Sequence, residues 1–163
     1  RPLDRRLFVV GVGPDYPRLD RMAPRNATLT GRASRPELAA IVAGARALIM
    51  PMVEDFGIVA VEAQAAGTPV IALGQGGVLE TVIDVRGAGS MHGTGLFFHE
   101  QTADSLAAAV REFDAHVFDV HTLRTNALRF EAAAFRAGMQ AAIAAMMRAE
   151  PREPLAVAAG VAG

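Results

Sequence analysis

The chain has 163 residues, of which 52% are hydrophobic and 20% are charged, and its formal net charge is −1. This length allows one domain with a full hydrophobic core, and the near-neutral charge argues against a nucleic-acid partner. Because the chain contains no cysteine and its 16 basic residues are all arginine, thiol catalysis, a Schiff-base lysine and a P-loop lysine are excluded for these residues.

Five short apolar segments recur along the chain, and each has the composition of a strand. They are rich in branched or aromatic side chains, and several end at Gly or Pro. Strands that are buried on both faces of a parallel sheet have this pattern. The predicted strands are residues 7–10, 27–30, 47–50, 69–72 and 95–98.

Segments with helical spacing separate these strands. Helices are predicted at residues 36–45, 57–66 and 106–113, where apolar side chains recur every three or four positions. Alternating strands and helices form βαβ units with right-handed crossovers, so we expect an α/β fold built on one open, doubly wound parallel sheet. The abrupt start at the first strand leads us to expect at least one more strand upstream.

From residue 119 onward the strand pattern stops and a helical one replaces it. Apolar side chains lie on one helical face at Phe130, Phe135, Met139, Ile143 and Met146. They predict a closing helix over about residues 128–147. This helix either packs on its own sheet or presents part of its apolar face to a second domain. We expect one domain over residues 1–149 and a disordered tail over residues 150–163.

A glycine-rich turn follows the first predicted strand at Gly11 and Gly13. A dinucleotide-binding fingerprint requires a third glycine where Tyr16 stands, and an acidic residue near the end of the second strand. The second strand ends in Gly31 and Arg32 and supplies no acid. A tight turn is therefore favoured over a dinucleotide site, although glycine also lets a ligand phosphate approach the backbone here.

The most informative segment lies between residues 51 and 70. A buried strand is predicted to end at Met50 and a helix to begin near Gly57, so the loop between them lies where doubly wound sheets bind ligands. The helix start suits an anionic phosphate. Glu62 lies roughly 7 Å further along the helix axis, at ~1.5 Å per residue, within reach of a ribose. Glu54 precedes the helix, within reach of a sugar.

Simpler interpretations of the same residues stay open. Glu54 and Asp55 could cap the helix, and Glu62 could be a solvated surface residue. A second glycine cluster at residues 74–77 could extend the anion site or could be an ordinary turn before a helix. The four histidines show no metal-ligand spacing, so no metal is expected.

The segment from Glu54 through the Glu62-Ala63 pair, followed by the Gly76-to-Thr81 run, resembles the family-4 retaining glycosyltransferases. The similarity extends over roughly residues 7–145. These enzymes have the two-domain GT-B fold. The resemblance therefore implies that the chain is the C-terminal half of such an enzyme, a Rossmann-like domain that binds a nucleotide-sugar donor.

The resemblance also implies roles for individual residues. Glu54 corresponds to the first glutamate of the Glu-x7-Glu motif and is the catalytic candidate near the donor sugar, while Glu62 is the second and contacts the ribose. The loop at Gly31 and Arg32 meets the base. The other donor-binding candidates are Gly13, Asp55, Phe56, Gly57, Ile58 and Val59.

The sequences of the motif and of residues 98–102 are similar to those of bacterial mannosyltransferases of polysaccharide assembly. It implies GDP-mannose as the donor, a saccharide or lipid-linked acceptor, retention of anomeric configuration and no cofactor. The Arg and Lys that neutralise the diphosphate in this family, and its acceptor domain, lie upstream of these residues. We therefore expect this chain to be inactive alone and cytoplasmic, with any membrane contact made through the missing domain.

Two other functions are weighed against this one. A non-catalytic nucleotide-binding domain can share the same sheet, and so can a nucleotide-sugar epimerase of related architecture. The Glu-x7-Glu spacing between Glu54 and Glu62 and the Gly76-Gly77-x2-Glu80 element argue against the epimerase.

Overall fold

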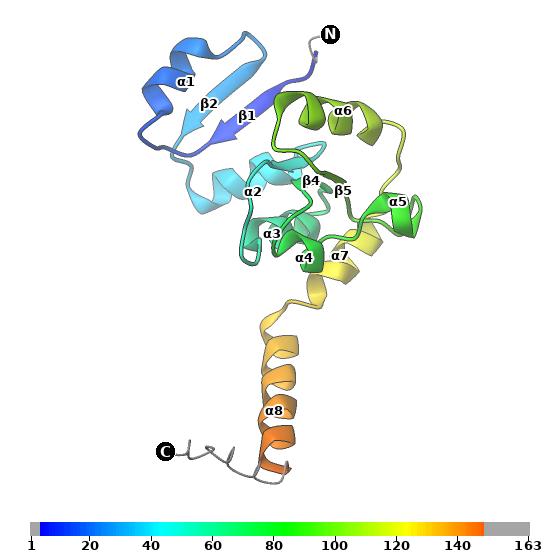
Figure 1. Cartoon of the computed structure of the whole chain (residues 1–163). Coiled ribbons are helices and arrows are strands. Elements are labelled where there is room, and N and C mark those ends of the chain that lie inside the picture. The colour runs from blue at the N-terminus through cyan, green and yellow to red at the C-terminus, as the bar shows by residue number, and fades with distance from the viewer. Residues whose placement is uncertain (1–3, 149–163) are drawn as a thin grey trace, which may run out of the picture. The chain divides into compact units, whose positions relative to one another are not determined.

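The computed structural model describes residues 4–148, and the chain divides into two compact units at the Arg129–Phe130 junction (Figure 1). The described part of the first unit alternates strands with helices, as expected. Its elements are β1 (Leu7–Val10), α1 (Tyr16–Met22), β2 (Ala27–Gly31), α2 (Arg35–Ala43), β3 (Leu48–Met50), α3 (Ile58–Ala66), β4 (Val70–Leu73), α4 (Val78–Thr81), α5 (Val85–Ala88), β5 (Gly95–Phe98), α6 (Ala103–Phe113) and α7 (Val120–Leu128).

All strand pairs are parallel, which confirms the predicted α/β class, but the strands do not form one continuous sheet. β1 pairs with β2, and β3, β4 and β5 pair in that order. Within residues 4–148 no hydrogen-bonded pairing joins the two groups. The segments that lead into β1 and β3 are nevertheless linked, because Arg5 and Arg46 both form ion pairs with the carboxylate of Asp114.

The hydrophobic core surrounds the three-stranded group, and β4 lies at its centre with all four residues buried. Successive side chains of a strand point to opposite faces. Accordingly Val70 and Ala72 pack into a cluster with Ala60 and Ala63 of α3. Residues 71 and 73 pack into a second cluster with Phe113 of α6. Helices therefore cover both faces, and Figure 1 shows α3 and α6 on opposite sides of β4 and β5.

The strands of the first pair are less well covered. Leu7, Phe8 and Val9 of β1 are exposed by 42%, 49% and 37%, although the segment has the apolar composition of a strand buried on both faces. By contrast, all four residues of β5 are buried. β4 and β5 are therefore buried much more completely than β1.

The second unit contributes one described helix, α8 (Ala132–Arg148). The predicted closing helix over residues 128–147 therefore starts later than expected, because α7 ends at Leu128 and a turn separates the two helices. Phe135 and Ile143 of the predicted apolar face are exposed. The tail predicted over residues 150–163 lies outside the described residues. Among residues 4–148, no helix combines the length and hydropathy that a membrane span requires.

Candidate functional site

A cavity of about 290 Å³ lies at the carboxyl end of β3, where the chain turns into α3. Six of the residues predicted for the site line it together with the last residue of the strand. The lining residues are Met50, Glu54, Asp55, Phe56, Gly57, Ile58 and Val59. The structure thus brings this part of the predicted site into a single pocket.

Gly57 sets the geometry of this pocket because it is the N-cap residue, directly before α3. Its backbone is left-handed, with φ +80° and ψ 48°, a conformation that costs a residue with a side chain about 1–2 kcal/mol. Space is not the constraint, since an added Cβ would lie 3.5 Å from Val78 and 3.6 Å from Thr81, in ordinary contact. Conformation is therefore the reason that glycine suits this position.

The first turn of α3 is open. No side chain caps it, and Glu54 and Asp55 thus do not act as the helix caps that the sequence left possible. The carbonyl of Gly57 accepts hydrogen bonds from the N–H groups of Ala60 and Val61, at 2.9 and 3.4 Å. The N–H groups before Ala60 have no partner inside the helix, and they carry the positive end of its dipole. An anion fits this position.

The second glycine cluster supports the same loop. The N–H of Gly77 donates to the carbonyl of Glu54 at 2.7 Å, and Gly76 forms a parallel bridge with Glu54. A Cβ on Gly77 would lie 2.3 Å from the carbonyl oxygen of Asp55 and 2.5 Å from Cα of Phe56. Glycine is therefore required for two backbones to touch here. The Gly77 amide braces the loop and is not available to an anion.

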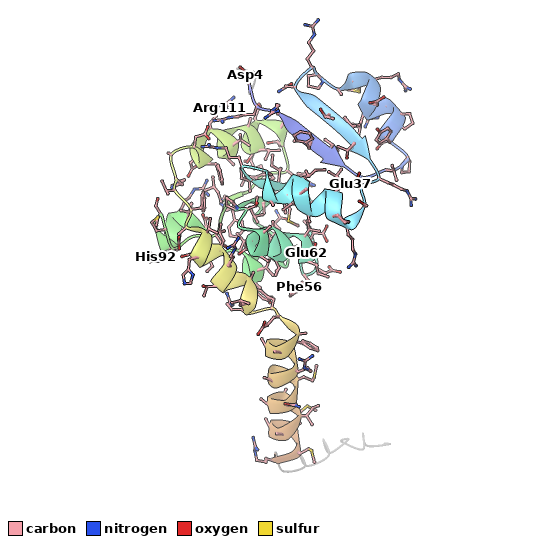
Figure 2. The ribbon with its side chains drawn as sticks, turned by 180° about the vertical axis from the view of Figure 1, so that it is seen from behind. Asp4, Glu37, Phe56, Glu62, His92 and Arg111 are labelled. Atoms are coloured by element: carbon pink, nitrogen blue, oxygen red, sulfur yellow. The ribbon has the colours of Figure 1, made fainter. Side chains whose placement is uncertain are left out.

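Glu54 and Glu62 occupy different positions relative to the pocket. Glu54 is exposed on the loop and lines the cavity. Glu62 is exposed on α3, one turn beyond its start, and is not among the lining residues. Figure 2 shows Glu62 on α3 and Phe56 on the loop before it. The lining residues include two carboxylates and no basic side chain, so among them only the backbone amides at the start of α3 favour an anion.

The remaining predicted residues lie at the ends of the other strand pair. Gly31 ends β2 with φ +68°, and its carbonyl accepts the N–H of Gly11 at 2.8 Å. The carbonyl of Gly13 accepts the N–H of Tyr16 at 3.0 Å, and Arg32 is exposed. Gly13, Gly31 and Arg32 thus lie at carboxyl ends of parallel strands, but they do not line the β3–α3 cavity.

A buried polar cluster beneath the loop was not predicted. Gln64 of α3, Thr81 of α4 and Asn126 of α7 have exposed fractions of 0%, 0% and 4%. Their side chains are hydrogen-bonded to one another or to backbone carbonyls. The available sequence signal was a glutamine among the alanines of a buried helix face, at the position four residues after Ala60.

A larger cavity of about 340 Å³ lies elsewhere, beside α5 and α6, and contains none of the predicted site residues. Two of its charged lining residues, Arg86 and Glu112, pair with each other. The guanidinium of Arg86 donates to both carboxylate oxygens of Glu112, at 2.7 and 2.8 Å, which lowers the pKa of Glu112 below its ordinary value. This arrangement is a structural clasp between α5 and α6.

No arrangement of metal ligands accompanies the site. Over residues 4–148, no three histidine or carboxylate side chains lie close enough together to hold a metal ion. The chemistry available at the β3–α3 cavity therefore consists of helix-terminal amides, two carboxylates and a glycine-braced backbone.

Known proteins are similar to this chain in sequence and in fold. The family described as Glycosyl transferases group 1 matches residues 1–114. Over 119 residues the chain is 37% identical to the GDP-mannose-dependent alpha-(1-6)-phosphatidylinositol monomannoside mannosyltransferase of Mycobacterium tuberculosis, which covers 65% of this chain and 29% of that protein. Over 59 residues it is 51% identical to the D-inositol 3-phosphate glycosyltransferase of Kineococcus radiotolerans, which covers 36% of this chain and 14% of that protein.

A solved structure shows the same similarity in three dimensions. Sucrose-phosphate synthase from Thermosynechococcus elongatus superposes with a TM-score of 0.64 and 28% identity, over 87% of this chain and 38% of that chain. The chain spans less than a third of the length of the two curated relatives above.

Proposed function

Because the chain belongs to the group 1 glycosyl transferases, we propose that it forms the donor-binding domain of a retaining hexosyltransferase with two GT-B domains. The observation that carries the proposal is the pocket at the start of α3. There an uncapped helix N-terminus, the carboxylate of Glu54 and the left-handed Gly57 surround one cavity. Such a pocket suits a diphosphate joined to a sugar.

We assign the parts of the donor to parts of the site as follows. The diphosphate lies against the N–H groups of Ile58 and Val59. The transferred hexose lies beside Glu54, and Glu62, one turn further along α3, accepts hydrogen bonds from the ribose. Gly13 allows close approach of the ligand to the backbone, and the base lies against the segment at Gly31 and Arg32.

The proposed donor is GDP-mannose, with transfer to a saccharide or lipid-linked acceptor in polysaccharide synthesis. One of the relatives is GDP-mannose-dependent by its name, which supports this choice. The proposed reaction retains the configuration of the sugar and needs no metal. We place the enzyme in the cytoplasm, in contact with the membrane, if at all, through its other domain.

The remaining parts of the active site belong, in this proposal, to the rest of a longer protein. The pocket contains no basic side chain among its lining residues, whereas a diphosphate carries two or more negative charges. The cations that neutralise it are therefore assigned to a segment upstream of these residues, and the acceptor site is assigned to the other domain. The regulatory nucleotide-binding domain and the epimerase are not favoured by the comparisons.

Thermal unfolding of the chain with nucleotide diphosphates tests the donor assignment. A ligand present at about ten times its dissociation constant stabilises the native state by roughly 1.4 kcal/mol. Without the upstream Arg and Lys we expect affinities on the order of 1 mM, so the ligand is titrated well above that concentration. GDP should raise the melting temperature more than UDP or ADP does. A preference for UDP would reject GDP-mannose and leave the sugar-transfer proposal intact.

Thermal unfolding with GDP and with GDP-mannose distinguishes the donor-binding domain of an enzyme from a non-catalytic nucleotide-binding domain. If Glu54 contacts the sugar, the intact donor should stabilise the chain at least as well as GDP does. A domain that only senses free nucleotide should prefer GDP, and that result would count against sugar transfer.

A further inference from the structure

Two buried amide side chains join three helices close to the donor loop, which is the segment between β3 and α3 (residues 51–57). Nε2 of Gln64 donates to the carbonyl oxygens of Ala60 and Thr81, at 3.0 and 2.9 Å. Nδ2 of Asn126 donates to Oε1 of Gln64 at 2.6 Å and to the same Thr81 carbonyl at 2.9 Å. Gln64 lies on α3, Thr81 on α4 and Asn126 on α7, so the amides connect segments that are far apart in the sequence.

The orientation of both amides is determined by their partners. Arginine can only donate hydrogen bonds. Because Nη1 of Arg129 lies 2.7 Å from Oδ1 of Asn126, the oxygen of that amide faces Arg129 and its NH2 group faces inward. The carbonyls of Ala60 and Thr81 can only accept, so the NH2 group of Gln64 faces them. Each group has a matching partner, and the network has one arrangement.

The shared acceptor is the carbonyl at the end of α4. Terminal carbonyls of a helix lack hydrogen-bond donors within the helix. Here the side-chain amides of Gln64 and Asn126 donate to the Thr81 carbonyl instead. α4 has only four residues, Val78–Thr81, and so short a helix has little stability of its own. Its position therefore depends on the core packing of Val78 and on the contacts at its two ends. Gln64 and Asn126 make the contacts at one of these ends.

The other end of α4 holds the donor loop. The hydroxyl of Thr81 donates to the carbonyl of Gly77 at 3.1 Å, and the N–H of Gly77 donates to the carbonyl of Glu54 at 2.7 Å. Thr81 also lies beneath Gly57, since a Cβ at Gly57 would be 3.6 Å from its hydroxyl. A continuous series of hydrogen bonds thus leads from Asn126 through α4 to the loop that lines the cavity.

We propose that Gln64 and Asn126 are positioning residues for sugar transfer, because through Thr81 they hold α4, and with it Glu54 and the start of α3, in the geometry that the donor requires. Burial of amides is costly unless every group is paired, and apolar side chains could fill the same space. The inference rests on the proposed function, and it adds residues that touch no part of the donor.

The test uses the whole protein with two variants of similar shape, Gln64→Met and Asn126→Leu. Displacement of reacting groups by about 1 Å costs up to a hundredfold in rate, so kcat/KM for the donor should fall between about tenfold and a hundredfold. Rates are measured far below the melting temperature of each variant, so that only folded protein is compared. The double variant should be little worse than the poorer single variant, because both act through one carbonyl.

The matched control is Val85→Ala. Val85 is 1% exposed and belongs to the second core cluster, apart from the network. Its truncation should lower the melting temperature and leave kcat/KM within about twofold of wild type. If the network variants also lose only stability and keep their kcat/KM, the positioning role is refuted.

Hydrogen exchange provides a measurement that does not depend on turnover. The Gly77 amide should exchange faster in both network variants than in Val85→Ala, relative to the amide of Phe97 in β5. Equal exchange of Gly77 in all three variants would overturn the proposal. If the wild-type protein transfers no hexose, the proposed function fails, and the exchange of Gly77 alone decides whether the network positions the loop.

A milder variant is used if the two inner variants, Gln64→Met and Asn126→Leu, do not fold. Arg129→Met changes an exposed side chain and leaves the buried pair in place. Because Asn126 then loses the partner that orients it, kcat/KM and Gly77 protection should both decrease, by less than in the inner variants. A folded Arg129→Met protein with neither change would contradict the proposal.

Discussion

Glu54 and Glu62 lie eight positions apart in the sequence, and different contacts hold them in place. The backbone of Glu54 is fixed by the hydrogen bond from Gly77, while its side chain is exposed at the cavity. Glu62 is carried by α3 and lies outside the set of residues that line the cavity. In the proposed complex they meet different parts of one ligand, and free nucleotide diphosphate lacks the part that Glu54 meets.

Substitution by glutamine should therefore separate the two residues in the whole protein. Loss of a hydrogen bond to a charged acceptor costs about 1.5–3 kcal/mol. Glu62→Gln should weaken GDP and GDP-mannose by similar factors, roughly tenfold to a hundredfold. Glu54→Gln should leave GDP binding nearly unchanged and reduce turnover. Calorimetry with both ligands, beside steady-state rates, checks this. If Glu54→Gln weakens GDP as much as Glu62→Gln does, the division of roles is wrong.

The glycine that braces the loop offers a second test at a single position. Gly77→Ala places a Cβ against the backbone of Asp55 and Phe56, so the loop must move. Overpacking of this kind costs about 1–3 kcal/mol, and binding of GDP should weaken as well. Gly87→Ala is the control, because a Cβ there has no atom within 4 Å. Comparable melting temperatures for the two variants would show that the loop adapts freely.

At the scale of elements, the clasp between α5 and α6 predicts a dependence on pH. Its hydrogen bonds from Arg86 lower the pKa of Glu112 in the folded state, so the clasp stabilises the fold above the unfolded pKa of about 4.5 and loses this effect as pH falls through the folded value. The side chains are 37% and 40% exposed, so solvent screening limits the contribution to about 1 kcal/mol or less.

The measurement is the difference in melting temperature between wild type and Glu112→Gln. The difference should be present at neutral pH and should vanish in acid below the folded-state pKa of Glu112. Glu131→Gln, at an exposed position, is the control and should show no such trend. A difference that grows on acidification would mean that Arg86 does not stabilise the charged carboxylate.

The sequence predicted some elements well and missed others, for physical reasons. The five strands were found because branched and aromatic side chains cluster in buried parallel strands, and β1 and β5 match the prediction residue for residue. α1 buries no residue and α5 has only four residues, so neither has a distinct apolar face. The candidate site residues from Glu54 to Val59 were predicted from their place after a strand. The contact between Gln64 and Asn126 was not, because 62 positions separate them.

At the scale of the whole molecule, the division of the strands into two groups is the feature that local patterns could not predict. Pairing of parallel strands depends on contacts between distant segments, and each segment has the same strand composition in either arrangement. The chain also spans less than a third of the length of its curated relatives. An enzyme that aligns a donor with an acceptor gains much of its rate from holding both.

We therefore expect the 163-residue chain alone to transfer no sugar from GDP-mannose to an added acceptor, while the whole protein does so under the same conditions. Release of GDP in the presence of acceptor provides the assay, and donor hydrolysis without acceptor is the control. Measurable transfer by this chain alone would show that these residues contain the acceptor site and the groups that neutralise the diphosphate.

The exposed β1 strand has a consequence for the behaviour of the chain at high concentration. Leu7–Val10 contains no charged residue and no proline, and within residues 4–148 it pairs only with β2. A strand edge of this kind is a template for further strand addition, and natural proteins usually protect such edges with charges, prolines or bulges. Of these features, β1 has only a register shift between Val9 and Val10. We therefore expect copies of the chain to associate by strand pairing at β1 when its concentration is high.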